Sequence, residues 1–118
     1  FSLKDMKGGE IYVKKIPSIK IIDIAKAIKK DVKYKIIGIR PGEKIHEQMI
    51  SEDDAMYTYE FKDYFIINSS NLKRKYMIGK KVHLGFQYSS DKNSNWLKAD
   101  ELNYWIKQNK KTFLKTIE

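Results

Sequence analysis

The sequence predicts an α/β fold in which a small mixed sheet packs with helices. Three segments predict this class. A β-branched and aromatic run at residues 10–13 predicts a strand, and apolar residues at helical spacing predict a helix over residues 19–30. The mostly apolar run at residues 34–39 predicts a strand buried on both faces, as in an α/β unit. The chain has 118 residues, which suits one domain or part of one.

Local signals place the elements of the first half of the chain. Ser18 is a suitable N-cap for the helix at 19–30. After the second strand, a loop rich in turn formers at residues 40–44 should lead into a short helix that begins near Glu43 or Lys44. The apolar face of the first helix is Ile21, Ile24, Ala25 and Ile28, and the short helix carries Ile45, His46, Met49 and Ile50. Because two strands alone make no stable sheet, we expect both to lie at the edge of a sheet whose other strands are outside this chain.

The second half predicts a hairpin and a final helix. Two strand-like runs at residues 56–61 and 64–68 are joined by two residues, which suggests a hairpin. Residues 69–85 are mostly polar and predict an exposed loop, and residues 86–89 predict a short extended piece. The last helix should run over residues 99–113. Its expected buried side chains are Leu102, Trp105, Ile106 and Phe113.

Composition limits the classes of function. The net charge of +9 and the pI of about 9.6 invite a nucleic-acid surface. However, Arg40 and Arg74 are the only arginines, and lysine is spread along the whole chain. We therefore favour a compositional bias and expect no nucleic-acid partner. The absence of cysteine excludes disulfides and thiolate metal sites and fits a cytoplasmic location. No apolar run is long enough to span a bilayer.

Several catalytic motifs are absent. No G-x-G-x-x-G or G-x-x-x-x-G-K-[ST] stretch occurs, so no dinucleotide or P-loop site is predicted. The two histidines are far apart, so no metal site is expected. A Tyr-x-x-x-Lys spacing occurs at Tyr76–Lys80 and at Tyr88–Lys92, but both lie in irregular polar stretches. We therefore predict no catalytic residue in this chain.

The densest polar cluster is the stretch from Arg40 to Glu47, directly after a predicted buried strand. Ligands gather beyond the carboxyl ends of strands in open α/β sheets. There Arg40 could hold a diphosphate through two donors, and Glu43 could accept hydrogen bonds from a ribose diol. The alternative, which spacing alone favours, is a solvated capping loop with Glu43 at a helix N-terminus. A second polar cluster at residues 88–97 predicts a structural surface loop anchored by Trp96.

Several segments resemble one enzyme family. Residues 8–13 (GGEIYV), 15–18 (KIPS) and 36–47 (IIGIRPGEKIHE) are similar to the C-terminal region of the inverting UDP-N-acetylglucosamine 4,6-dehydratases. That family typically has GGEIFVPKIPS and IIGIRPGEKLHE. The departures here are Tyr12, Lys14 and Ile45. Shorter likenesses at residues 63–67 and 88–97 extend the resemblance over most of residues 7–106.

The resemblance implies a fold and a role. Residues 1–118 would form the C-terminal nucleotide-sugar-binding lobe of an extended short-chain dehydrogenase/reductase, with the Rossmann half absent. Arg40 would bind the UDP diphosphate and Glu43 the uridine ribose of UDP-N-acetylglucosamine. Lys44, His46 and Glu47 match the motif and could contact substrate or be structural. NADP, which oxidises C4 before water is eliminated across C5 and C6, would be bound by the N-terminal half, and no cofactor is expected on this chain alone.

The resemblance leaves alternatives open. The complete enzyme would serve surface polysaccharide or pseudaminic acid synthesis as a homo-oligomer, and a 4-epimerase of the same superfamily is the neighbouring possibility. The chain begins with Phe1, which we take as a fragment boundary. A stand-alone basic module is the alternative from another class. It would bind either a nucleotide or a nucleic acid without catalysis.

Overall fold

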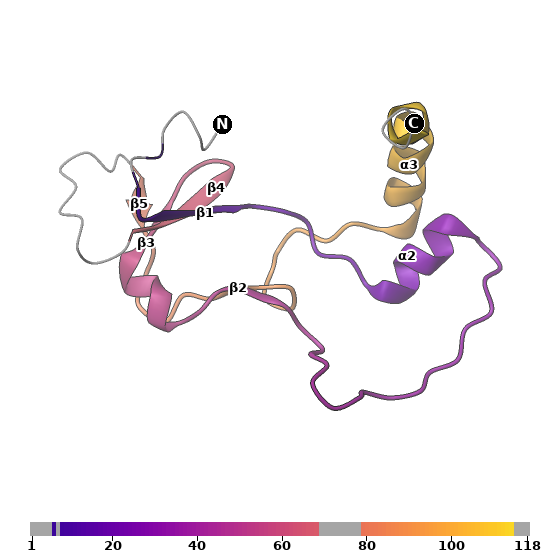
Figure 1. Ribbon diagram of the computed structural model, residues 1–118, viewed down its shortest axis with the longest axis horizontal. Helices are drawn as coiled ribbons and strands as arrows, with labels where there is room; N and C mark the ends of the chain where they lie inside the picture. The colour runs from indigo at the N-terminus through magenta and orange to yellow at the C-terminus, as the bar shows by residue number, and fades with distance from the viewer. Residues whose placement is uncertain (1–5, 7, 69–78, 115–118) are drawn as a thin grey trace. The chain divides into compact units, whose positions relative to one another are not determined.

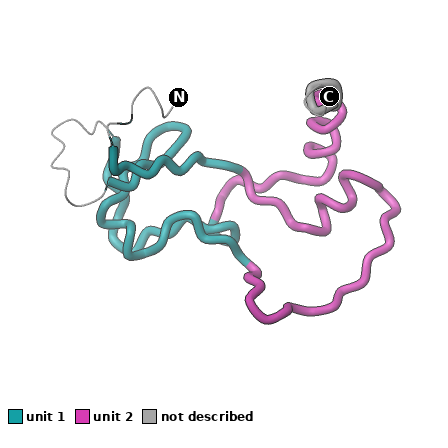
Figure 2. Tube along the Cα trace, viewed as in Figure 1, with its two compact units in different colours: residues 1–16, 46–92 teal, residues 17–45, 93–118 magenta. Residues whose placement is uncertain are grey.

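A computed structural model describes residue 6 and residues 8–68 and 79–114, with side chains as far as residue 109. The elements in chain order are β1 (Glu10–Lys14), α2 (Ile21–Ile28), β2 (Gln48–Ile50), the 3-10 helix η1 (Asp53–Tyr57), β3 (Thr58–Glu60), β4 (Tyr64–Asn68), β5 (Lys80–Lys81), β6 (Tyr88–Ser89) and α3 (Ala99–Leu114) (Figure 1). They fall into two compact units (Figure 2). Unit 1 is residues 1–16 and 46–92, and unit 2 is residues 17–45 and 93–118.

Unit 1 is built on a four-stranded antiparallel sheet with strand order β1-β4-β3-β5. Strand β4 is central because its sequence YFIIN is apolar and β-branched, and its three middle residues are buried. The hairpin of β3 and β4 confirms the predicted pairing of these two runs. Residues 69–78 of the predicted loop lie outside the described residues, and the remainder contributes the short strand β5.

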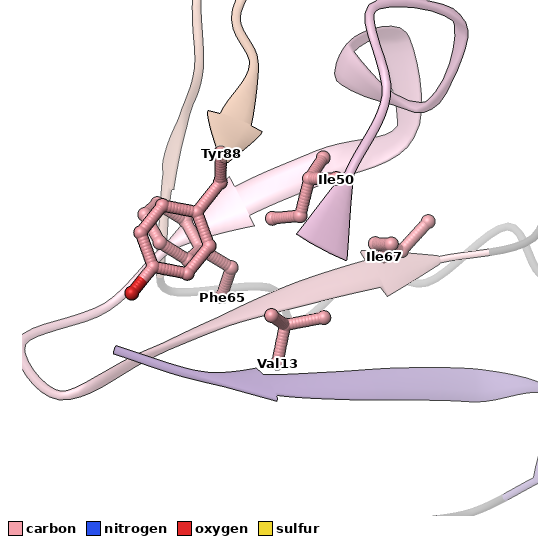
Figure 3. Close-up of a cluster of buried hydrophobic side chains, with 5 residues drawn as sticks. All are labelled: Val13, Ile50, Phe65, Ile67 and Tyr88. Carbon is pink, nitrogen blue, oxygen red and sulfur yellow. The ribbon is translucent and has the colours of Figure 1, made fainter. Parts of the chain in front are cut away.

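A second, two-stranded ribbon of β2 and β6 belongs to the same unit. It supplies Ile50 and Tyr88 to a core cluster that also contains Val13, Phe65 and Ile67 (Figure 3). Ile50 is fully buried, and the ring centroids of Phe65 and Tyr88 lie 5.1 Å apart. Strands distant in sequence therefore meet in a single apolar cluster, and the burial of these side chains stabilises unit 1.

Unit 2 pairs the helices α2 and α3. Ala27 of α2 is buried. Its backbone carbonyl oxygen accepts a hydrogen bond from the side-chain amide of Asn103 in α3. The first turn of α3 is capped by Glu101, whose carboxylate accepts the Lys98 N–H at 2.7 Å. This is the half of a capping box in which the glutamate accepts the backbone N–H of the N-cap residue; Lys98 supplies no side-chain oxygen for the other half.

Ser18 ties the two polypeptide stretches of unit 2 together. It forms a parallel β-bridge with Trp96, with backbone hydrogen bonds of 2.8 Å to Asn95 and Leu97. The predicted N-cap role of Ser18 is therefore wrong. Lys20 occupies the N-cap position of α2 in extended backbone, with no side-chain cap. The tertiary bridge fixes Ser18 three residues before Ile21, where the helix starts.

The α/β class is confirmed, but two predicted elements are wrong. Residues 34–39 form no strand, and Ile36 is 79% exposed, because no described strand pairs with them to bury their faces. The short helix predicted after Glu43 is also absent. Residues 48–50 are the strand β2 instead, since pairing with β6 buries Ile50 in the core.

Burial and sheet membership differ from prediction in three further places. Trp105 of α3 is 50% exposed rather than buried, and the apolar residues Ile21 and Ile28 of α2 are 79% and 72% exposed. The side chain of Phe113 lies outside the described residues. Strand β1 does lie at a sheet edge, but this chain itself supplies the neighbouring strands, so the expectation that they lie elsewhere is wrong for β1.

Candidate functional site

The loop at residues 40–43 is a closed turn. The Glu43 N–H donates to the Arg40 carbonyl oxygen at 3.0 Å. Pro41 occupies the second position, where its ring fixes φ, and Gly42 occupies the third with a φ of 86°. A type II turn requires a positive φ at its third position, which glycine adopts without strain. The Pro-Gly sequence therefore dictates this turn.

The turn brings the two predicted binding side chains together. Arg40 Nε lies 3.0 Å from Glu43 Oε1, and the Arg40 N–H donates to Glu43 Oε2 at 2.9 Å. Both side chains remain open to solvent, with exposed fractions of 71% for Arg40 and 46% for Glu43. Among the described residues the guanidinium has no other hydrogen-bond partner, so its terminal nitrogens are available to an anion. This geometry suits a phosphate or diphosphate.

The five residues predicted for the site fall into both units. Arg40, Glu43 and the exposed Lys44 belong to unit 2, whereas His46 and Glu47 belong to unit 1. Both His46 and Glu47 are exposed, and the backbone of Glu47 is held by Ser90. The Glu47 N–H donates to Ser90 Oγ at 3.1 Å, and its carbonyl oxygen accepts the Ser90 N–H at 2.8 Å. These contacts hold the backbone of Glu47, and its side chain stays exposed to solvent.

Residues 88–92 also have structural contacts. The Tyr88 hydroxyl donates to the carbonyl oxygen of Ile16 at 2.9 Å and accepts its N–H at 2.8 Å. Lys92, which completes the Tyr88–Lys92 spacing, donates to the side chain of Gln87. Tyr76, the first residue of the other matching pair, lies outside the described residues. These contacts agree with the structural interpretation of this loop.

Sequence reasoning missed the cluster around Asp91. The Ser89 hydroxyl donates to Asp91 Oδ1 at 2.6 Å and is the main cause of a lowered pKa of Asp91. Burial works in the opposite direction, whereas the backbone hydrogen bond at Asp91 and the nearby His46 and Lys92 lower the pKa further. Only the Ser-Ser-Asp composition signalled a turn here, because no local pattern shows that His46 approaches from a distant segment.

Two searches of the described residues bear on other kinds of site. No group of three histidine, aspartate or glutamate side chains gathers among them as a metal ion would need. None of the helices in the described part of the chain has the length and apolar character to cross a membrane.

Comparison with known proteins assigns the family. The family described as "Polysaccharide biosynthesis protein" matches residues 1–69, more than half of the chain. This chain belongs to that family. A family relative, the UDP-N-acetylglucosamine 4,6-dehydratase (inverting) of Campylobacter jejuni, is 48% identical over 107 residues, which cover 82% of this chain and 32% of the relative. The resemblance found in the sequence is therefore confirmed.

Two further relatives support the family and the fold. The UDP-glucose 4-epimerase of Rickettsia canadensis is 30% identical over 112 residues, covering 86% of this chain and 32% of the epimerase. The X-ray structure of Pen from Bacillus thuringiensis superposes with a TM-score of 0.69 at 30% identity, covering 92% of this chain and 32% of Pen. The chain thus spans about a third of the length of each of these three proteins.

Proposed function

We propose that this chain is the UDP-sugar-binding part of an NADP-dependent UDP-N-acetylglucosamine 4,6-dehydratase that inverts C5. The observation that carries the proposal is the preformed turn of Arg40 and Glu43 in a chain 48% identical to an enzyme of that name. The family description supports a role in polysaccharide synthesis. We propose surface polysaccharide or pseudaminic acid synthesis as the pathway. The second relative also carries a UDP-sugar in its name, so the shared ligand is a UDP-hexose.

The turn suits one end of such a ligand. A diphosphate carries two adjacent anionic groups, which the planar fork of Arg40 can contact with two donors. The carboxylate of Glu43 has lone pairs beyond those used by Arg40, so it can accept a ribose hydroxyl. Lys44 follows directly and adds positive charge. The motif match gives His46 and Glu47 two candidate roles, a substrate contact or a structural one.

The chemistry would reside outside this chain. A dinucleotide site needs a glycine-rich turn between a strand and a helix N-terminus. Here β1 leads to α2 through residues 15–20, which contain no glycine, so these residues do not fit NADP. We assign the cofactor to the part of the enzyme that corresponds to the rest of the relatives' length.

Exposed apolar side chains in unit 2 support the view that this chain is part of a larger enzyme. They lie on α2 and on the segments before and after the turn at residues 40–43, where they are exposed to water in this chain. The set is Ile21, Ile28, Tyr34, Ile36, Ile37, Ile39 and Ile45. We further propose that the complete enzyme is a cytoplasmic homo-oligomer, as its resemblance implies.

Calorimetric titration of the chain with UDP tests the proposal. Replacing Arg40 with alanine removes two charge-assisted hydrogen bonds to the diphosphate, so UDP should bind about 10- to 100-fold more weakly. Lys33→Ala is the control, because it removes one exposed positive charge from the same unit. Equal UDP affinity of the Arg40→Ala variant and the wild-type chain would show that the site assignment is wrong.

Two rival functions give different results. The epimerase relative favours a 4-epimerase. NMR of the sugar product made by the complete enzyme distinguishes the two, because only the dehydratase yields a 4-keto-6-deoxy sugar. The charge of +9 favours a basic module that binds nucleic acid. Such binding would fall steeply with salt and would not depend on Arg40.

A further inference from the structure

We infer that Glu43 is a positioning residue for Arg40: its carboxylate holds the guanidinium by Nε and leaves the two terminal nitrogens facing an incoming diphosphate. This inference rests on the proposed function and adds a role beyond the ribose contact that the resemblance implies. The starting observation is that each oxygen of the Glu43 carboxylate has a partner on the same arginine.

The contacts form one closed unit. The Glu43 side chain makes two contacts: Oε2 accepts the backbone N–H of Arg40 at 2.9 Å, and Oε1 lies 3.0 Å from Arg40 Nε. The backbone N–H of Glu43 donates to the Arg40 carbonyl oxygen at 3.0 Å. Exposed ion pairs are usually weak because two long side chains must be ordered to form them. Here part of that ordering is already achieved, since Pro41 and Gly42 fix the backbone that carries both side chains.

The edge of the guanidinium that Glu43 occupies matters. Arginine can present either its Nε side or its terminal Nη1–Nη2 edge to a planar pair of acceptors. With Nε engaged by Glu43, the terminal edge is the one left for a ligand. Two donors on one edge match two oxygens of a diphosphate. Holding the guanidinium before the ligand arrives also lowers the entropy lost on binding.

A ligand without a ribose separates this role from a ribose contact. Inorganic pyrophosphate offers the diphosphate alone, so a glutamate that only binds ribose has no favourable contact with it. The Glu43→Gln change removes a negative charge beside the anion, which by Coulomb attraction alone should strengthen pyrophosphate binding. A positioning role predicts the opposite sign. Loss of the fixed guanidinium should weaken pyrophosphate binding by about fivefold.

The experiment titrates the 118-residue chain with pyrophosphate and with UDP by calorimetry. The variants are Glu43→Gln, Arg40→Ala and the matched control Asp31→Asn, which removes the same charge from an exposed site in unit 2. We expect Glu43→Gln to weaken both ligands and Asp31→Asn to weaken neither. Weaker UDP binding with unchanged or stronger pyrophosphate binding would overturn the inference and leave the proposed function standing with Glu43 as a ribose ligand.

A measurement without ligand keeps the two questions separate. Arg40 and Arg74 give the only Nε–Hε signals in the chain, and Arg40→Lys identifies the first. We expect Glu43→Gln to speed the exchange of the Arg40 Hε with water, because the variant loses the carboxylate that holds Nε. Equal exchange in the wild-type chain and in Glu43→Gln would overturn the inference. If the wild-type chain bound no UDP, the proposed function would fail, and this signal would still decide whether Glu43 fixes Arg40.

Discussion

The hydroxyl of Tyr88 should contribute measurably to the stability of unit 1. It makes two hydrogen bonds to the backbone of Ile16, at 2.8 and 2.9 Å, while its ring packs 5.1 Å from that of Phe65. Tyr88→Phe removes both bonds and keeps the ring. Each net hydrogen bond is worth about 1 kcal/mol. Because the Ile16 residue is 47% exposed, water can partly replace the hydroxyl, and we expect a loss of about 1–2 kcal/mol.

Native-state hydrogen exchange of the β4 amides measures this loss in unit 1 alone. A loss of 1–2 kcal/mol should speed the exchange of Phe65 and Ile67 about 5- to 30-fold. Tyr57→Phe is the matched control, since Tyr57 lies in the same unit with 37% exposure, and it should change the free energy of opening by less than about 0.5 kcal/mol. Exchange in Tyr88→Phe as slow as in the control would refute the role assigned to the hydroxyl.

Two further predictions concern the same unit. Ile50→Ala should destabilise unit 1 by about 2–5 kcal/mol in the same exchange measurement, because removing the fully buried side chain leaves a cavity. The control is Ile11→Ala, at an exposed position of the same unit. A smaller loss of stability in Ile50→Ala than in Ile11→Ala would contradict the assigned core. Ser89→Ala should raise the pKa of Asp91 toward its ordinary value, as followed by carboxyl-carbon NMR, and an unchanged pKa would show that the hydroxyl does not set it. Because the pKa of Asp91 is lower in the folded chain than in the unfolded one, its ionised carboxylate stabilises the fold at a pH above the unfolded pKa. This stabilisation is lost as the pH falls through the folded pKa. Ser89→Ala should therefore make the free energy of unfolding of unit 1 depend less on pH in this acid range.

Local chemistry made part of the fold and the site predictable. The Pro-Gly dipeptide before Glu43 specifies a turn whatever surrounds it, and the structure has that turn. Helical spacing located α2 and α3, and β-branched runs located β1 and β4. These signals act within a few residues, and at these positions the tertiary context agrees with them. The motif around Arg40 likewise predicted the family to which the chain belongs.

Long-range pairing decided what the sequence by itself could not. Residues 34–39 and 48–50 are both apolar and β-branched in part, yet only the second segment is a strand, because β6 lies beside it and no described strand lies beside the first. Likewise, Ser18 had the composition of an N-cap but pairs with Trp96, and the contact of Glu43 with Arg40 was not predictable from composition. The sequence determined which groups could hydrogen-bond and which segments were apolar. Only the tertiary structure determined their partners, because a strand or an ion pair depends on groups that chain folding brings together.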